Sequence, residues 1–140
     1  MRLVIDTNIV FSALLYGGKP LQILQLVFEG QAQAFASEWM LSELSGILSR
    51  PEHTARLTKL RTTAAQVSDD YSGVIQFIIP KALEYKVSRD INDDPILACA
   101  LSAKADLIVS GDKDLLVLKE FGGMPIVSAA QALERLQKAP

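Results

Sequence analysis

The chain has 140 residues, of which 49% are hydrophobic and 21% charged, with a net charge of −2 at pH 7. A chain of this length buries about two thirds of its unfolded surface, so we expect one soluble domain over residues 1–140. No apolar run reaches the roughly 18 residues of a membrane span, and Asp6 interrupts the first apolar run, so we expect neither a membrane anchor nor a signal peptide.

The chain has one cysteine, Cys99, and one histidine, His53. A lone cysteine excludes an internal disulfide and fits a reducing cytoplasm, so we expect a cytoplasmic protein. Without a Cys or His cluster there is no zinc site, and histidine-based catalysis would depend on His53 alone.

The net charge does not by itself indicate a nucleic-acid-binding protein. If four acids gathered in one site, 12 of the 16 acids would remain against 14 Lys and Arg elsewhere. The charge therefore does not argue against a polyanionic substrate.

Residues 3–5 form an apolar run that predicts a short buried strand, and Asp6 follows at its carboxyl end. An apolar helix follows through Leu15. After a turn at 17–20, the spacing of apolar residues predicts a helix over 20–29 that Gly30 ends.

Residues 31–36 predict a second strand, and Ser37 is expected to cap a helix that runs to about Ser49. Glu43 lies in the first two turns of that helix. We expect Trp39 and Met40 to be core residues, and Pro51 to mark the break.

Residues 50–61 form the most basic segment, with Arg50, Arg56, Lys59 and Arg61 against the single acid Glu52. Two interpretations stay open at this point. The segment is either a solvated helix or loop, or a rim that contacts phosphates and binds RNA.

The apolar pattern predicts a helix over 62–77 and a short strand over 77–80 that Pro80 stops. Residues 84–87 are ambiguous. The polar loop 88–95 is expected to begin a strongly apolar helix, because Asp is a good N-cap and Pro95 suits a first turn.

In the last third, residues 107–109 predict another buried strand and 110–114 its terminal loop. A short helix over 115–118 is expected to end at Gly122-Gly123, before a strand over 125–127 and a helix over 129–137. Strands that alternate with helices predict an α/β fold whose mainly parallel sheet is covered on both faces.

Each of two predicted strands is followed, at its carboxyl end, by an acidic residue: Asp6 after the first and Asp112 after the other. In a parallel sheet these ends share one edge, where α/β folds place their ligands. The helix that begins near Asp93 and Asp94 must start at that edge, and Glu43 lies in a helix that also leaves it.

Four converging carboxylates would repel one another unless some were protonated or a cation bound. An all-oxygen donor set selects hard ions, so we expect Mg²⁺ or Mn²⁺. Such an ion supports hydrolysis of a phosphodiester by water.

The sequence resembles the PIN-domain family, in particular the VapC-like ribonuclease toxins of bacterial toxin–antitoxin systems. The matching stretches span nearly the whole chain in the family's order: Val4–Val10, Ser37–Leu48, Arg89–Ala100 and Val109–Leu116. The resemblance implies a three-layer α/β/α sandwich with a metal-dependent ribonuclease site.

The resemblance also implies site residues. Asp6, Glu43 and Asp112 match the family's acids directly, and Asp93 is favoured as the third acid, with Asp94 as its substitute. Asn8 and Ser110 match supporting positions, and Asp114 matches a frequent extra acid. Ser110 stands where threonine is common, and Asn92 where an acid is common.

We therefore expect a toxin of a type II toxin–antitoxin module, with RNA as substrate, a small antitoxin protein as partner, and a homodimer as one expected state. Two alternatives are a housekeeping RNA-processing or flap nuclease and a PIN domain that only binds RNA or protein. A receiver-like phosphoacceptor domain is disfavoured, because Asp6 has no second acid beside it.

Overall fold

The structure is a computed structural model that describes residues 1–87 and 93–138. Its strands are β1 Arg2–Ile5, β2 Gln33–Ala36, β3 Gln76–Phe77, β4 Leu107–Val109, β5 Glu120–Phe121 and β6 Met124–Val127. Its helices are α1 Thr7–Tyr16, α2 Gly18–Phe28, α3 Glu38–Leu48, the 3₁₀ turn η1 Pro51–His53, α4 Thr54–Lys59, α5 Ala64–Ser72, α6 Asp94–Ala103, α7 Lys113–Leu116 and α8 Ala129–Lys138.

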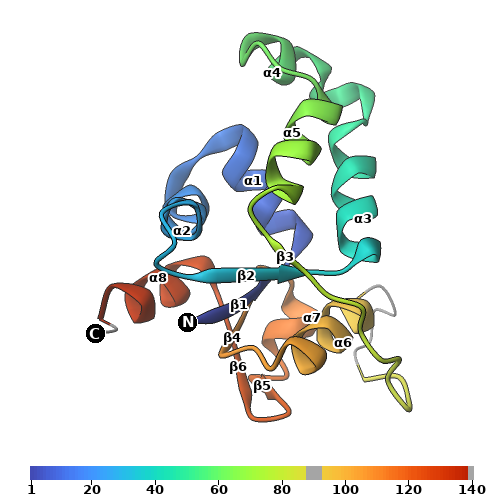
Figure 1. Cartoon of the computed structure of the whole chain (residues 1–140), viewed down its shortest axis with the longest axis vertical. Coiled ribbons are helices and arrows are strands. Elements are labelled where there is room, and N and C mark those ends of the chain that lie inside the picture. The colour runs from blue at the N-terminus through green and yellow to red at the C-terminus, as the bar shows by residue number, and fades with distance from the viewer. Residues whose placement is uncertain (88–92, 139–140) are drawn as a thin grey trace.

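Within the described residues the strands form one six-stranded sheet in the order β3-β2-β1-β4-β6-β5. All neighbours pair parallel except β5 and β6, which pair antiparallel. The sheet is the middle layer of the molecule, with α1, α2, α3 and α5 on one side and α6 and α7 on the other (Figure 1). The predicted three-layer α/β/α sandwich with a mainly parallel sheet is confirmed.

The two faces of the sheet carry separate hydrophobic cores. Leu3 and Ile5 of β1 point into the core beneath α1, α2 and α8, whereas Val4 points into the core beneath α6. All three side chains are buried. Alternate residues of a strand face opposite sides, so a short unbroken apolar run is what a strand with two covered faces requires.

Ser37 caps α3 as predicted, with its Oγ accepting a hydrogen bond from the Met40 backbone N–H at 3.3 Å. Met40 and Cys99 are buried, and Trp39 is partly buried against the core. Gly30 follows α2 with a φ of +79°.

The helix predicted over 62–77 is too long. It is α5, which begins after the cap residue Thr63 and ends at Ser72, and the chain then turns into β3. Ile75 continues the apolar pattern because it packs against both cores, not because it is helical. The strand predicted over 77–80 begins earlier, since Gln76 and Phe77 are the residues that pair with β2.

The second difference lies after α7. We predicted that Gly122-Gly123 ends a helix over 115–118, but α7 spans Lys113–Leu116 and the two glycines form the turn of a β5–β6 hairpin. Their φ values are +57° and +81°. Two consecutive residues with positive φ are typical of a two-residue hairpin turn, so this pair is a hairpin signal.

Among the described residues, none of the helices has the length and apolar character that crossing a membrane requires.

Candidate metal centre

The acidic residues meet at the carboxyl edge of the sheet, between β1 and β4. These two strands are parallel neighbours, with Ile5 opposite Val109. From β1 the chain builds the sheet toward β2 and β3, and then returns to the other side of β1 with β4. Between β1 and β4 the order therefore reverses, and such a switch point opens a crevice at the carboxyl ends of the strands.

Asp6 follows β1 at this edge and is 5% exposed. One carboxylate oxygen, Oδ1, accepts a hydrogen bond from the Asn8 backbone N–H at 3.4 Å, so Asp6 caps α1. Burial raises the pKa of Asp6 above its ordinary value of 3.8, and the nearby charge of Asp112 raises that pKa further. Hydrogen bonds from Ser110 and Asn8 partly offset the rise in pKa.

Ser110 joins the two strand ends. Its Oγ donates to Asp6 Oδ2 at 2.7 Å and accepts from the Asp112 backbone N–H at 3.0 Å. Ser110 is 0% exposed, so water does not compete for the hydrogen bonds of its hydroxyl group. This one side chain thus positions the acid of β1 against the loop that carries Asp112.

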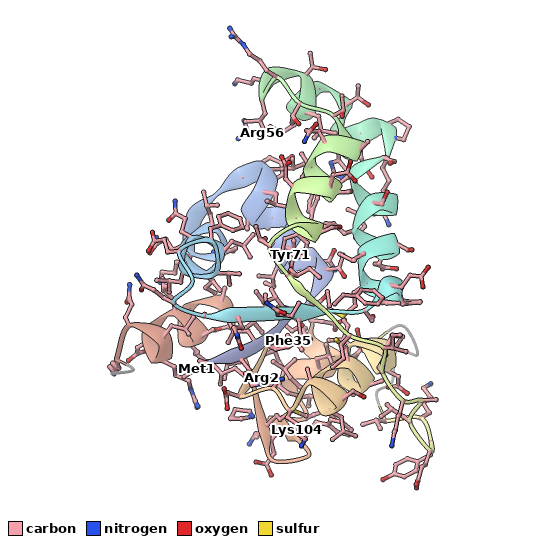
Figure 2. All side chains as sticks on the ribbon, in the orientation of Figure 1. Met1, Arg2, Phe35, Arg56, Tyr71 and Lys104 are labelled. Carbon is pink, nitrogen blue, oxygen red and sulfur yellow. The ribbon has the colours of Figure 1, made fainter. Side chains whose placement is uncertain are left out.

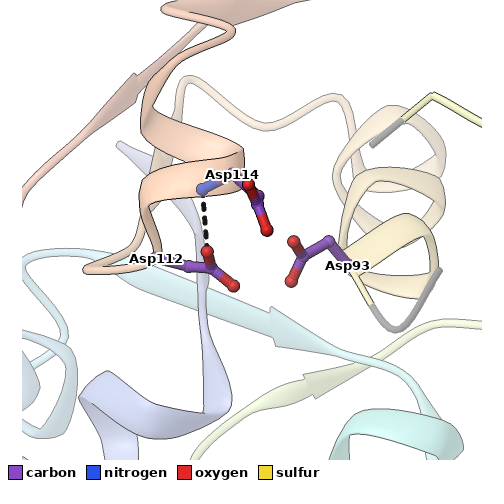
Figure 3. A group of neighbouring side chains, drawn as sticks. All are labelled: Asp93, Asp112 and Asp114. Atoms are coloured by element: carbon purple, nitrogen blue, oxygen red, sulfur yellow. Dashed lines mark hydrogen bonds between the residues drawn. The ribbon is translucent and has the colours of Figure 1, made fainter. Parts of the chain in front are cut away.

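Three further acids come together beside it. Asp93, Asp112 and Asp114 each present a carboxylate oxygen, and these oxygens lie within 4.8 Å of one another. Figure 3 shows the carboxylate of Asp93 reaching from the start of α6 toward those of Asp112 and Asp114 at the start of α7. Asp112 Oδ1 accepts from the Asp114 backbone N–H at 2.8 Å, which fixes the turn that brings both acids to this point.

Asp93 occupies the cap position of α6, but its carboxylate makes no capping hydrogen bond to that helix. It is 4% exposed, whereas Asp112 and Asp114 are partly exposed. The crevice is thus acidic from a buried wall outward to a solvent-facing rim.

The donor set fits a hard divalent cation. Carboxylate oxygens bind Mg²⁺ at about 2.0–2.1 Å, so two oxygens on opposite sides of one ion lie about 4.2 Å apart. The oxygens of the three-acid group all lie within 4.8 Å of one another, which is close to that spacing. Neither His53 nor Cys99 joins the group, so softer metals find no nitrogen or sulfur ligand there.

The structure separates the two aspartates that the sequence left as alternatives. Asp93 belongs to the three-acid group, whereas Asp94 Oδ2 accepts a hydrogen bond from the Val87 backbone N–H at 3.0 Å. Asp94 also lines a different hollow, together with Tyr85 and Lys86. Of the two, only Asp93 belongs to the group that could hold a metal ion. Asn92 and the other residues of 88–92, Arg89 included, lie outside the described residues.

Glu43 lies on α3, is partly exposed and is not a member of the three-acid group. It lines a surface hollow of about 360 Å³ together with Trp39 and Arg50. Asn8 is exposed in the first turn of α1, and its backbone N–H supports Asp6.

The basic segment folds as η1 and α4, at the far end of α3 and α5 from the sheet (Figure 1). Lys59 and Arg61 are exposed there, and Arg50 is exposed at the end of α3. Arg56 is partly buried, and its Nε donates to the Leu15 carbonyl at 2.7 Å. Sequence reasoning missed this anchor, because nothing in the spacing of residues marks a contact between a side chain and a distant carbonyl.

The comparisons with known proteins agree with this architecture. Residues 2–114 match the family model described as PIN domain. A chain in the crystal structure of VapBC2 from Rickettsia felis bound to a DNA fragment from their promoter superposes with a TM-score of 0.60. It is 18% identical in sequence, and the match covers 91% of this chain and 98% of that chain. No curated protein matches the chain in sequence.

Proposed function

This chain belongs to the PIN domain family, and from that premise we propose that it is a metal-dependent endoribonuclease that acts as the toxin of a type II toxin–antitoxin module. The observation that carries the proposal is the group of Asp93, Asp112 and Asp114, whose oxygens lie within 4.8 Å of one another beside Asp6. We further propose that residues 1–140 form a single nuclease domain and that the protein works in the cytoplasm.

In this proposal Asp93, Asp112 and Asp114 hold Mg²⁺ or Mn²⁺, with Asp6 contributing from the end of β1. When bound, the ion supplies Lewis-acid activation of water and neutralises charge that develops on a phosphodiester. Asp6 is poised by Ser110, whose hydroxyl bridges it to the Asp112 backbone. Glu43, on α3, is proposed as a fifth acid of the site.

The chain's own residues also determine what happens without an ion. Asp6 is buried and its pKa is raised, so full ionisation of the acids is unfavourable in the metal-free protein. Binding a divalent cation removes that electrostatic penalty. The acids are thus arranged for a cation at the expense of the stability of the metal-free protein.

The toxin assignment is supported by the fold that this chain shares with a chain of the VapBC2 structure. We propose RNA as the substrate and a small antitoxin protein as the partner, with a homodimer as a further expectation. A housekeeping RNA-processing or flap nuclease would use the same acids. A PIN domain that only binds RNA or protein would be expected to lack one of them, and Asp6, Glu43, Asp93 and Asp112 are all present.

The test is cleavage of labelled single-stranded RNA by the purified protein in Mg²⁺ or Mn²⁺, repeated after exhaustive chelation. We expect cleavage that EDTA abolishes and that the variant Asp112→Asn loses. Asp69→Asn is the matched control, since Asp69 is exposed on α5 and should leave the rate unchanged. Activity that survives complete removal of divalent ions contradicts the proposal.

The toxin role has its own test. Induced expression in bacteria should arrest growth, Asp112→Asn should relieve the arrest, and co-expression of a small protein encoded beside this gene should do the same. Cleavage in vitro without growth arrest would favour the housekeeping nuclease.

A further inference from the structure

Away from the acidic crevice, aromatic and basic side chains gather where α4 meets the end of α1. The ring centroids of Phe11 and His53 lie 4.5 Å apart, and those of Phe11 and Tyr16 lie 6.1 Å apart at an interplanar angle of 72°. The guanidinium carbon of Arg56 lies 5.2 Å from the centroid of the Tyr16 ring.

Arg56 is fixed in this cluster. Its Nε donates to the Leu15 carbonyl at 2.7 Å, a group at the end of α1. Its terminal nitrogens have no hydrogen-bond acceptor within the part of the chain that the structure describes. Figure 2 shows Arg56 on α4, well away from the sheet. An arginine held by one nitrogen can present the others to an incoming phosphate with less loss of side-chain entropy.

Tyr16 provides the second element. It is 58% exposed, although its ring contacts both Phe11 and the guanidinium of Arg56. Its neighbour Phe11 is partly buried and packs against the core. An exposed aromatic ring beside a preorganised guanidinium is the combination on which single-stranded nucleic acids stack, because every base has a π-face and every linkage a phosphate.

We propose that Tyr16 and Arg56 form a subsite for single-stranded RNA, in which a base stacks on Tyr16 and the adjoining phosphate binds Arg56. The proposal rests on the ribonuclease function proposed above and names where the strand runs. Lys59 and Arg61, both exposed on or just after α4, add positive charge on the same side of the fold.

The position of the subsite predicts a length of strand. α1 begins at Thr7, directly after Asp6, and has 10 residues up to Tyr16. At 1.5 Å per residue the helix carries the strand about 14 Å from the acidic crevice. At about 3.4 Å per stacked nucleotide this is about four nucleotides, and fewer if the strand is extended. RNA shorter than this cannot occupy the acidic crevice and the Tyr16 subsite at the same time.

The experiment measures binding rather than cleavage, by fluorescence anisotropy of labelled oligouridylates of 3 and 12 nucleotides in the Asp112→Asn background. Tyr16→Ala, Tyr16→Phe and Tyr85→Ala are compared. Tyr85 is the matched control, since it is also an exposed tyrosine, 74% against 58% for Tyr16, and lies on the segment before α6. Thermal melting of each variant shows whether the fold is intact.

We expect Tyr16→Ala to weaken binding of the 12-mer by about five-fold or more, the lower range for loss of one base stack. Tyr16→Phe should keep the affinity because the ring is retained. Tyr85→Ala should leave the affinity unchanged, and Tyr16→Ala should weaken binding of the 12-mer more than of the 3-mer, because only the 12-mer can occupy the crevice and the subsite together. Equal affinity of Tyr16→Ala and its parent for the 12-mer overturns the subsite, as does an equal loss in Tyr85→Ala.

The outcomes also separate this inference from the proposed function. EDTA-sensitive cleavage together with unchanged binding by Tyr16→Ala rejects the subsite and leaves the nuclease standing. Tyr16-dependent binding by a protein that never cleaves RNA supports the subsite and rejects the nuclease. A lower melting temperature of Tyr16→Ala with unchanged affinity means that the cluster only tethers α4 to α1, which overturns the subsite.

Discussion

Individual hydrogen bonds to acids and hydroxyls position the residues of the crevice. Asp6 both caps α1 through its bond with the Asn8 N–H and accepts from Ser110 at 2.7 Å. A capping residue and a candidate metal ligand are therefore the same side chain. The two functions are compatible because α1 begins where β1 ends, and a helix N-terminus favours a negative charge.

Replacing Asp6 by Asn should abolish metal-dependent cleavage and raise the melting temperature of the metal-free protein. The pKa of Asp6 is raised in the folded state, so the folded protein holds this proton more tightly than the unfolded chain does. Stability then falls as pH rises above the ordinary value of 3.8, and the asparagine variant escapes that loss. The stability gain of Asp6→Asn should therefore grow between about pH 4 and neutral pH, measured by thermal unfolding in EDTA. A gain that is the same at every pH would refute the electrostatic explanation.

Asp93→Asn and Asp94→Asn should behave differently. Asp93 contributes an oxygen to the three-acid group, whereas Asp94 holds the Val87 N–H. We expect Asp93→Asn to lose cleavage and Mn²⁺ affinity, and Asp94→Asn to keep both while losing a small amount of stability. Calorimetric titration with Mn²⁺ and cleavage assays on both variants decide the assignment. Inactivity of Asp94→Asn alone would reverse it.

At the level of elements, α4 is attached to α1 rather than exposed on all sides. Arg56 contacts Leu15 at the end of α1, and His53 contacts Phe11 in the middle of that helix. Lys59 and Arg61 remain exposed. The basic residues of this segment thus divide into one arginine that is part of the packing and others that are solvated. Charge counting along the sequence does not distinguish these roles.

That division predicts two kinds of variant. Lys59→Ala combined with Arg61→Ala should weaken binding of all single-stranded RNA sequences alike and lower the log–log salt slope by about 1.4, two contacts at about 0.7 each. Its melting temperature should not change. Arg56→Ala should lower the melting temperature as well, because it removes the bond to the Leu15 carbonyl. Binding isotherms between 50 and 200 mM salt provide the measurement, and an unchanged slope for the double variant would exclude both residues from RNA contact.

At the scale of the whole molecule, the order of the strands creates the crevice. Asp6 and Ser110 are separated by 104 positions in the chain, yet their side chains share a hydrogen bond. They meet because β1 and β4 are parallel neighbours at the point where the strand order reverses. The acids of α6 and α7 arrive from the same side, since both helices begin at this edge.

A site assembled from distant segments should couple metal binding to folding. An ion that binds only the folded protein stabilises it by about 2.7 kcal/mol at a concentration 100 times its Kd. We therefore expect Mg²⁺ or Mn²⁺ to raise the melting temperature, with a smaller rise for Asp112→Asn. Asp69→Asn serves as the control that keeps the full rise. An equal rise in Asp112→Asn would show that the ion binds elsewhere.

The sequence alone was enough to predict the layered α/β fold, the strands β1, β2, β4 and β6 and the cap at Ser37. These depend on local patterns, namely short apolar runs, helical spacing and polar residues at helix starts. The same patterns indicated that acids converge at one edge of the sheet, and the resemblance to PIN-domain proteins favoured Asp93 over Asp94 and added Asp114. Asp6, Glu43, Asp93 and Asp112 as a catalytic set, and Arg50 as an RNA contact, stay predictions.

The tertiary structure decided the features that depend on contacts between residues far apart in the chain. It brought Asp93 rather than Asp94 to Asp112 and Asp114, because one residue of helix rotates a side chain by about 100° and only packing sets the direction. Helix α5 ends at Ser72 because Gln76 and Phe77 pair with β2. Gly122-Gly123 forms a hairpin turn because β5 and β6 pair antiparallel on either side of it. The tertiary structure also attached Arg56 to Leu15, a contact across 41 positions that depends on how α4 packs on α1.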